Sequence, residues 1–262
     1  MEAFVQSALA AAKAAAEEIL RYYRGDFEVE IKPDQTPVTV ADRRAEEIIK
    51  SMLLSDFPDH GFFGEESGKE QSEAEFLWLV DPIDGTKSFV RGYSMFSTQI
   101  ALMRKGELVV GVSSAPAANE IAWAARGMGA WLDGRRVHVS DVSRLEDASV
   151  STGNLRSVAR SPQWNRLGEI FAVVNRTRGY GDYYHYHRLA AGQIDAVIES
   201  DVNILDIAAL GVIVSESGGV FTDLEGRPLT MDTRSVLAAT PGLHGQLLRI
   251  LNGEVAREDS HG

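Results

Sequence analysis

The sequence predicts two structural halves, an α+β half over residues 1–140 and an α/β half over residues 141–262. Three observations lead to this fold class. Two amphipathic helical patterns open the chain, short strands joined by tight turns follow up to about residue 140, and strands alternate with helices beyond it. With 262 residues, of which 44% are hydrophobic and 24% charged, the chain is long enough for one large or two medium domains.

The first half opens with a helix, because apolar residues recur at helical spacing over residues 4–23 and Gly25 can end it. Residues 27–31 alternate as a short strand, and a second helix runs to about residue 54. The remaining elements are strands, and Asp133-Gly134 is a hairpin turn between two of them. We expect these strands at residues 76–80, 95–103, 108–113, 120–125, 129–132 and 135–139.

The second half alternates strand-like and helix-like segments, the pattern of an α/β domain. Short apolar runs predict strands at residues 149–152, 172–176, 195–198, 220–222 and 236–239. Helices are expected at residues 183–191, 206–217 and 243–251. A sheet with helices packed on it is therefore expected in this half.

Composition limits the partners and the compartment. The formal net charge is −12, so general binding to nucleic-acid phosphates or to an anionic membrane is not expected. The chain has no cysteine, which excludes disulfides and thiolate metal sites and fits a reducing, cytoplasmic compartment. Residues 1–24 carry scattered charges, unlike a signal peptide, and no run of about 18 apolar residues predicts a membrane span.

Residues 81–86, Asp-Pro-Ile-Asp-Gly-Thr, are the strongest indication of chemistry. The apolar run 76–80 leads into them, so Asp81 and Asp84 follow the carboxyl end of a strand. The intervening proline stiffens the turn, so both carboxylates and the Ile83 carbonyl can face one space. Ligands made only of oxygen suit a hard cation such as Mg²⁺.

Gly85 and Thr86 begin a helical turn, and the N–H groups of such a turn can bind phosphate oxygens.

Three further acids have suitable positions: Glu65 follows a short apolar run, while Asp42 and Asp206 stand at helix starts. Each feature also has a simpler explanation. An Asp-Pro turn before glycine is common, Asp is a favoured helix cap, and Glu65 suits a solvated loop.

Four segments together resemble the inositol monophosphatase superfamily of Mg²⁺-dependent phosphomonoesterases. Residues 64–67 resemble its GEE(S) segment, residues 81–86 are identical to its DPIDGT motif, and residues 206–209 with 216–219 resemble its WDxAA…EAGG segment. The order and spacing agree over nearly the whole chain, with Leu205 where many members carry Trp. The resemblance implies a layered α/β/α/β/α sandwich, an active site between the two halves and a homodimer.

The resemblance also implies roles for individual residues. Glu65, Asp81 and the Ile83 carbonyl would hold one Mg²⁺, Asp81, Asp84 and Asp206 would hold a second, and Glu65 would help place a third.

Four other residues would complete this site. Thr86 with Asp42 would orient the attacking water, and Lys32 matches a family lysine near the metal site. The N–H groups of Gly85 and Thr86 would bind phosphate. Water would then attack without a covalent enzyme intermediate, since no cysteine and no G-x-S-x-G segment supplies a nucleophile.

Further stretches resemble the bacterial histidinol-phosphate phosphatase branch, namely residues 81–92, 114–116, 124–127 and 178–183. We therefore expect hydrolysis of a small phosphate monoester, with histidinol phosphate as substrate. Inositol phosphate is the alternative, followed by a broad range of sugar phosphates. A non-catalytic interaction protein on the same fold is disfavoured, because every expected acid is present.

Asp182 and Glu199 are the candidate readers of that substrate. Histidinol carries an ammonium group that two carboxylates can bind by charge-assisted hydrogen bonds, and Arg178 can balance the added charge or contact the substrate. The alternative is that Asp182 caps the following helix. His185 and His187, spaced by one residue, would point apart on that helix, so we interpret them as packing or interface residues instead of a metal pair.

Overall fold

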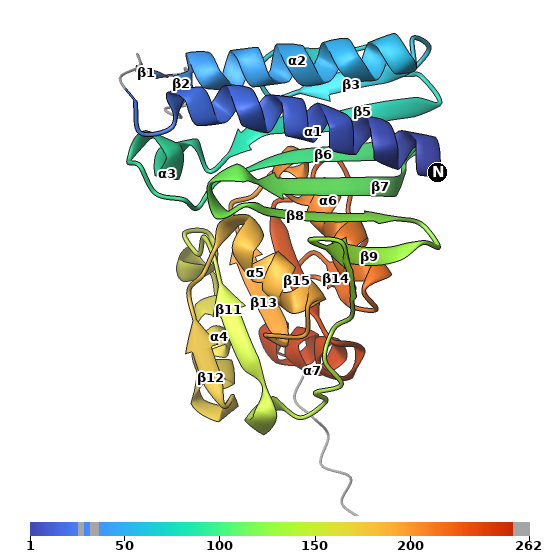
Figure 1. Cartoon of the computed structure of the whole chain (residues 1–262). Helices are drawn as coiled ribbons and strands as arrows, with labels where there is room; N and C mark the ends of the chain where they lie inside the picture. Colours follow the sequence, from blue (N-terminus) through green and yellow to red (C-terminus); the bar gives the residue numbers. More distant parts are fainter. Residues whose placement is uncertain (26–28, 32–36, 254–262) are drawn as a thin grey trace, which may run out of the picture.

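The computed structural model describes residues 1–25, 29–31 and 37–253 (Figure 1). The helices in this part of the chain are α1 (Glu2–Tyr22), α2 (Val40–Asp56), α3 (Thr86–Val90), α4 (Gln163–Val173), α5 (Asp182–Ala190), α6 (Ile204–Glu216) and α7 (Pro241–Leu251). A short antiparallel pair joins β1 (Val29–Ile31) to β2 (Pro37–Thr39).

The remaining strands form two mixed sheets. Across the larger sheet the order is β10 (Arg135–Val137), β9 (Gly129–Leu132), β8 (Glu120–Ala125), β7 (Glu107–Ala115), β6 (Ser97–Arg104), β5 (Phe76–Asp84), β3 (Gly61–Gly64) and β4 (Gly68–Glu70). Across the smaller sheet it is β12 (Arg176–Arg178), β11 (Ser149–Thr152), β13 (Ala196–Ser200), β15 (Ser235–Ala239) and β14 (Val220–Thr222). Neighbours in the larger sheet are antiparallel except β3 and β5, whereas β12, β11 and β13 run parallel.

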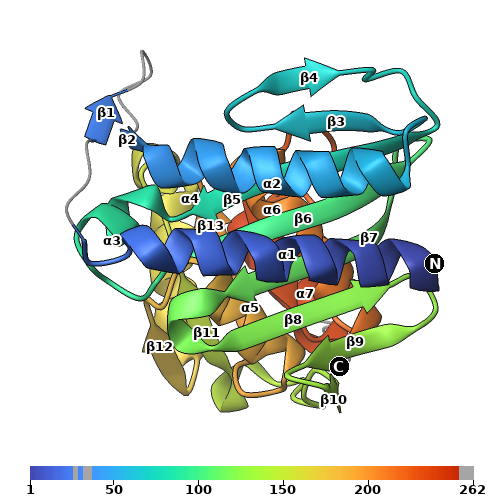
Figure 2. The same cartoon turned by 45° about the horizontal axis from the view of Figure 1, so that its top comes forward.

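The helices and sheets stack in five layers (Figure 1). Helices α1 and α2 cover the outer face of the larger sheet, where Figure 2 shows them side by side. Helices α5 and α6 lie between the two sheets, and α4 and α7 cover the outer face of the smaller one. The layered α/β/α/β/α sandwich that the resemblance implies is therefore confirmed.

Helix α6 occupies the centre of this stack and positions one end of the site. It is apolar on all sides, as expected for a helix buried between two sheets. Gly111 of β7 lets it approach closely, because a Cβ at that residue would lie 2.3 Å from the carbonyl oxygen of Ala209. The close approach at Ala209 therefore holds α6 tightly against the larger sheet.

Most expected elements are present within a few residues, but two expectations are wrong. Residues 172–176 do not form a strand. The amphipathic helix α4, with Leu167 and Ile170 buried, continues to Val173, and the strand begins at Arg176. Strand β5 also continues through residue 84 instead of ending at residue 80. Among the helices that the structure describes, none combines the length and apolar character needed to cross a membrane.

Candidate active site

Three carboxylates from β5 and α6 meet where α6 packs against the larger sheet. Ligand oxygens of Asp81, Asp84 and Asp206 all lie within 4.8 Å of one another. In a regular strand, residues three apart point to opposite faces. Here the pairing of β5 with β6 shifts register between Asp81 and Asp84, and this irregularity turns both side chains to one space.

Electrostatics make these acids suitable for a divalent cation. Burial raises the pKa of Asp81 well above its usual range, and repulsion from Glu65, Asp84 and Asp206 raises it further. Burial is also the main cause for Asp84, whose pKa is raised well above normal, and for Asp206, whose pKa rises to about 7. Oxygen-only ligands around divalent cations would offset both the burial and the repulsion, so the residues present fit Mg²⁺.

Two of the expected site acids are not N-caps but the third residues of capping boxes. Asp42 Oδ2 accepts hydrogen bonds from the backbone N–H and the hydroxyl of Thr39, at 2.8 and 2.6 Å. Asp206 likewise accepts from the backbone N–H of Asn203 at 2.9 Å and from its side-chain amide at 2.6 Å. The helix starts therefore fix both carboxylates, so capping and a place in the site are compatible.

Thr86 connects Asp42 to the strand that carries the cluster. Its hydroxyl oxygen lies 3.2 Å from Asp42 Oδ1 and 3.0 Å from the Ile83 carbonyl oxygen. Gly85 precedes it with φ +89°, and a Cβ there would lie 2.8 Å from the Met95 carbonyl oxygen. Gly85 is the N-cap of α3 and Thr86 is its first residue, so the N–H groups of both lie at the start of this short helix.

Glu65 lies in the turn after β3, and its charge adds to the raised pKa of Asp81. The buried side chain of Glu46 holds this turn by accepting from the backbone N–H groups of Glu66 and Ser67, at 2.8 and 2.7 Å. Only glycine fits at Gly64, because a Cβ would lie 2.4 Å from the Glu46 carboxyl carbon. Sequence reasoning missed Glu46, since its helical position looks like any exposed glutamate.

The second half brings two more carboxylates to the cluster. A small pocket of about 30 Å³ has Asp182 and Glu199 in its lining together with Asp84 and Asp206. Asp182 is the first residue of α5 and has φ +47°, while Gly181 is the N-cap, so Asp182 does not cap the helix as the alternative supposed. Burial, and then Glu199, raise the pKa of Asp182 to about 6.

Glu199 is fixed by three protein donors. One oxygen accepts from the Tyr186 hydroxyl at 2.7 Å and lies 3.1 Å from His185 Nε2, and the other accepts from the Asn154 N–H at 3.1 Å. Burial alone would raise the pKa of Glu199, but His185 and these hydrogen bonds outweigh it, so the pKa lies below normal. Sequence reasoning missed Asn154 and Tyr186, because Asn154 reaches Glu199 only through the pairing of β11 with β13, and Tyr186 only through the packing of α5 on β13.

The structure does not bring every expected residue to this pocket. Arg178 is exposed on the edge strand β12, and its guanidinium donates to the Thr177 carbonyl oxygen at 2.7 Å. Lys32 lies outside the described residues. His185 and His187 are both buried and hydrogen-bonded to protein groups, as expected of packing residues.

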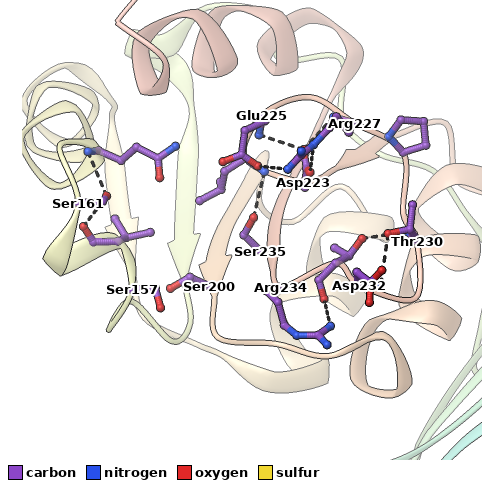
Figure 3. A pocket seen from close by; sticks show the side chains of 15 residues that line it. Ser157, Ser161, Ser200, Asp223, Glu225, Arg227, Thr230, Asp232, Arg234 and Ser235 are labelled. Carbon is purple, nitrogen blue, oxygen red and sulfur yellow. Dashed lines mark hydrogen bonds and ion pairs between the residues drawn. The ribbon is translucent and has the colours of Figure 1, made fainter.

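A larger cavity of about 500 Å³ lies elsewhere, beside the segment that joins β14 to β15 (Figure 3). Two of its carboxylates, Asp223 and Glu225, are paired with Arg227 at 2.7 and 2.8 Å. Because both carboxylates are already paired with a guanidinium, this cavity is a poorer place for a cation than the Asp81 cluster. We therefore assign the chemistry to the smaller acidic pocket.

Comparison with known proteins agrees with this geometry. A profile of the inositol monophosphatase family matches residues 1–256. The histidinol-phosphatase of Mycobacterium tuberculosis is 41% identical over 244 residues, covering 90% of this chain and 94% of that protein. The inositol-1-monophosphatase of Mesorhizobium japonicum is 34% identical over 229 residues, or 86% of each protein.

A solved structure of the extragenic suppressor protein suhB from Bartonella henselae matches with a TM-score of 0.88 at 32% identity. The match covers 97% of this chain and 100% of that one. Fold, acidic cluster and sequence matches over most of the chain all agree. The chain therefore belongs to the inositol monophosphatase family and is a phosphoric monoester hydrolase.

Proposed function

We propose that this enzyme hydrolyses L-histidinol phosphate to L-histidinol and phosphate in a Mg²⁺-dependent reaction. The observation that carries the choice of substrate is the placement of Asp182 and Glu199 beside Asp84 and Asp206 in one pocket. The metal ligands explain phosphate hydrolysis in general, whereas the added carboxylate of Asp182, beside Glu199, is the feature that would favour an amine over a neutral alcohol.

Asp81, Asp84, Asp206 and Glu65, with the Ile83 carbonyl, are the residues that would hold two or three Mg²⁺ ions. Such ions, when bound, lower the pKa of water and stabilise the leaving oxygen. The N–H groups of the Gly85 turn would contact the phosphate.

The protein's own part in the hydrolysis is to place the water and the ester. Asp42 is held by Thr39, so its remaining oxygen can accept the Thr86 hydroxyl proton. The Thr86 oxygen then has a lone pair directed at the water, which fixes the water for in-line attack on phosphorus. The attacking water forms a new P–O bond while the ester P–O bond breaks on the opposite side, and the leaving alcohol oxygen takes up the proton that the water gives up.

The carboxylate of Asp182 supports an amine as the group attached to that alcohol. Its pKa of about 6 leaves it ionised near neutral pH, in a half-buried place next to the like charge of Glu199. An ammonium group would relieve this repulsion and add charge-assisted hydrogen bonds. Inositol offers only hydroxyl groups, so it gains less from Asp182.

Inositol 1-phosphate remains the second candidate, because a relative of comparable coverage carries the name inositol-1-monophosphatase. Phosphate release by the purified protein with Mg²⁺ distinguishes the two. The assay compares L-histidinol phosphate, inositol 1-phosphate and adenosine 3′,5′-bisphosphate. We expect the highest kcat/KM for histidinol phosphate, and a higher value for either other substrate would reject the proposal.

A further inference from the structure

A chain of polar side chains crosses the otherwise apolar contact between the larger sheet and α5. Its members are buried residues of β6, β7 and α5, and none is a proposed metal ligand. They are Ser97, Gln99, Ser113 and His187. The chain ends at Asp84 on one side and at Glu120, the first residue of β8, on the other.

The strand register places these groups in contact. Ser97 lies opposite Asp84 across the β5–β6 pair, and its hydroxyl is 3.4 Å from Asp84 Oδ2. Gln99, two residues along the same strand face, lies opposite Ser113. The Gln99 amide nitrogen donates to Ser97 Oγ at 2.8 Å and to Ser113 Oγ at 3.0 Å.

His187 completes the chain from the helix side. Its Nε2 lies 2.8 Å from Ser113 Oγ, and its Nδ1 lies 2.6 Å from Glu120 Oε1. Glu120 is in turn held by Arg188. Burial lowers the pKa of His187 more than Glu120 raises it, so the ring is neutral, with Nδ1–H donating to Glu120 and Nε2 accepting the Ser113 hydroxyl.

This arrangement determines which way Ser97 donates. Both amide hydrogens of Gln99 are used on the two serines, while its Oε1 is buried without a hydrogen-bond partner in the structure described. Turning the amide over would satisfy Oε1, but Oε1 would then compete for the Ser97 hydroxyl that donates to Asp84. His187 prevents this by taking the Ser113 hydroxyl, which leaves Ser113 Oγ as an acceptor for the amide nitrogen.

We infer that His187 is a positioning residue, which acts through Ser113, Gln99 and Ser97 to hold the Asp84 carboxylate in place for a metal ion. The inference rests on the proposed function, since it takes Asp84 to be a ligand. Hydrogen-bond partners of metal ligands typically affect metal affinity by about 10- to 100-fold. Burying polar side chains in an apolar layer costs free energy, and a role in placing a metal ligand explains why this layer contains them.

Calorimetric titration of the metal-free protein with Mg²⁺ tests this, alongside urea unfolding in EDTA. Ser113→Ala removes one hydroxyl far from the cluster, and Ser114→Ala is the matched control on the neighbouring residue. We expect Ser113→Ala to weaken Mg²⁺ binding at least about tenfold, with the control unchanged. An unchanged Kd for Ser113→Ala, with or without a loss of stability, would overturn the inference.

Two variants at residue 187 give an independent check. His187→Gln keeps an acceptor at the place of Nε2, which meets Ser113. His187→Asn keeps a polar group only at the place of Nδ1, which faces Glu120, and loses the acceptor for Ser113. Mg²⁺ affinity should be closer to wild type in His187→Gln, and equal affinities would contradict the role of His187. If wild type itself bound no Mg²⁺ and released no phosphate, the proposed function would fail instead, so the two failures are distinguishable.

Discussion

The Thr86 hydroxyl lies 3.2 Å from Asp42 Oδ1, which joins two residues 44 positions apart in the chain. The same hydroxyl lies 3.0 Å from the Ile83 carbonyl, a proposed metal ligand. Because a hydroxyl has one proton, a bond to Asp42 leaves the Ile83 carbonyl available for the metal. This relationship links the proposed water-orienting pair to the proposed metal site.

In the proposed mechanism Asp42 orients the Thr86 hydroxyl, and this hydroxyl orients the attacking water. Thr86→Val removes the hydroxyl and should therefore lower kcat strongly, by about 10²-fold. Thr86→Ser keeps the hydroxyl and should retain most of the activity. Steady-state phosphate release checks both variants. Similar kcat values for the Ser and Val variants would show that the hydroxyl is not used.

Asp84→Asn should separate catalysis from stability. Loss of one ligand charge should cost about 3 kcal/mol of transition-state stabilisation, roughly a hundredfold in kcat. In EDTA the same change should raise the free energy of unfolding, because burial and the charges of its acidic neighbours disfavour the ionised Asp84. A variant that was as active as wild type, or less stable than wild type without metal, would contradict the assignment.

Metal removal should abolish turnover reversibly. Activity should vanish in excess EDTA and return with added Mg²⁺, because the buried acids then repel one another and the phosphate. Full turnover in chelator would reject the metal-dependent account.

Gly153→Ala should displace the Glu199 carboxylate in the proposed substrate pocket. A Cβ at residue 153 would lie 1.9 Å from Glu199 Oε1, so the carboxylate must move away from the Asn154 N–H. We expect a loss of about 1–3 kcal/mol in the free energy of unfolding, measured in urea. Gly168→Ala in α4 is the control, because nothing lies within 4 Å of its Cβ, and it should be neutral or stabilising.

Asp182→Asn should stabilise the metal-free protein at high pH. The folded pKa of about 6, raised by burial and then by Glu199, exceeds the unfolded value, so wild-type stability is lost as pH rises through about 6. Asparagine lacks this penalty and should gain about 1–3 kcal/mol near pH 8, with a smaller gain near pH 4. Urea unfolding in EDTA at both pH values measures it, and a pH-independent difference would contradict a half-buried Asp182 that ionises with a raised pKa.

The shared space of Asp81 and Asp84 was predictable, because the stiff turn after the apolar run 76–80 can aim both carboxylates to one side, whereas the place of Asp206 beside them was implied only by the family resemblance. Thr39 and Asn203 could also have been found, since each stands three residues before an acid, as in a capping box.

Other parts depend on register and packing that local patterns do not encode. The contact of Ser97 with Asp84 requires the cross-strand pairing of β5 and β6, and Glu46 reaches the Glu65 turn only through the packing of α2. Helix α4 was missed because its apolar end, residues 170–174, reads equally well as a strand.

The central claim is that Asp182 recognises an amine on the substrate. The most direct test is kcat/KM of wild type and Asp182→Asn on L-histidinol phosphate and on a small neutral-alcohol phosphate. Asp201→Asn is the control, because Asp201 also has a positive φ, of 59°, but lies outside the pocket lining. We predict a loss of at least about tenfold, or 1.4 kcal/mol, on histidinol phosphate alone. Equal losses on both substrates, or no loss on either, would contradict the account.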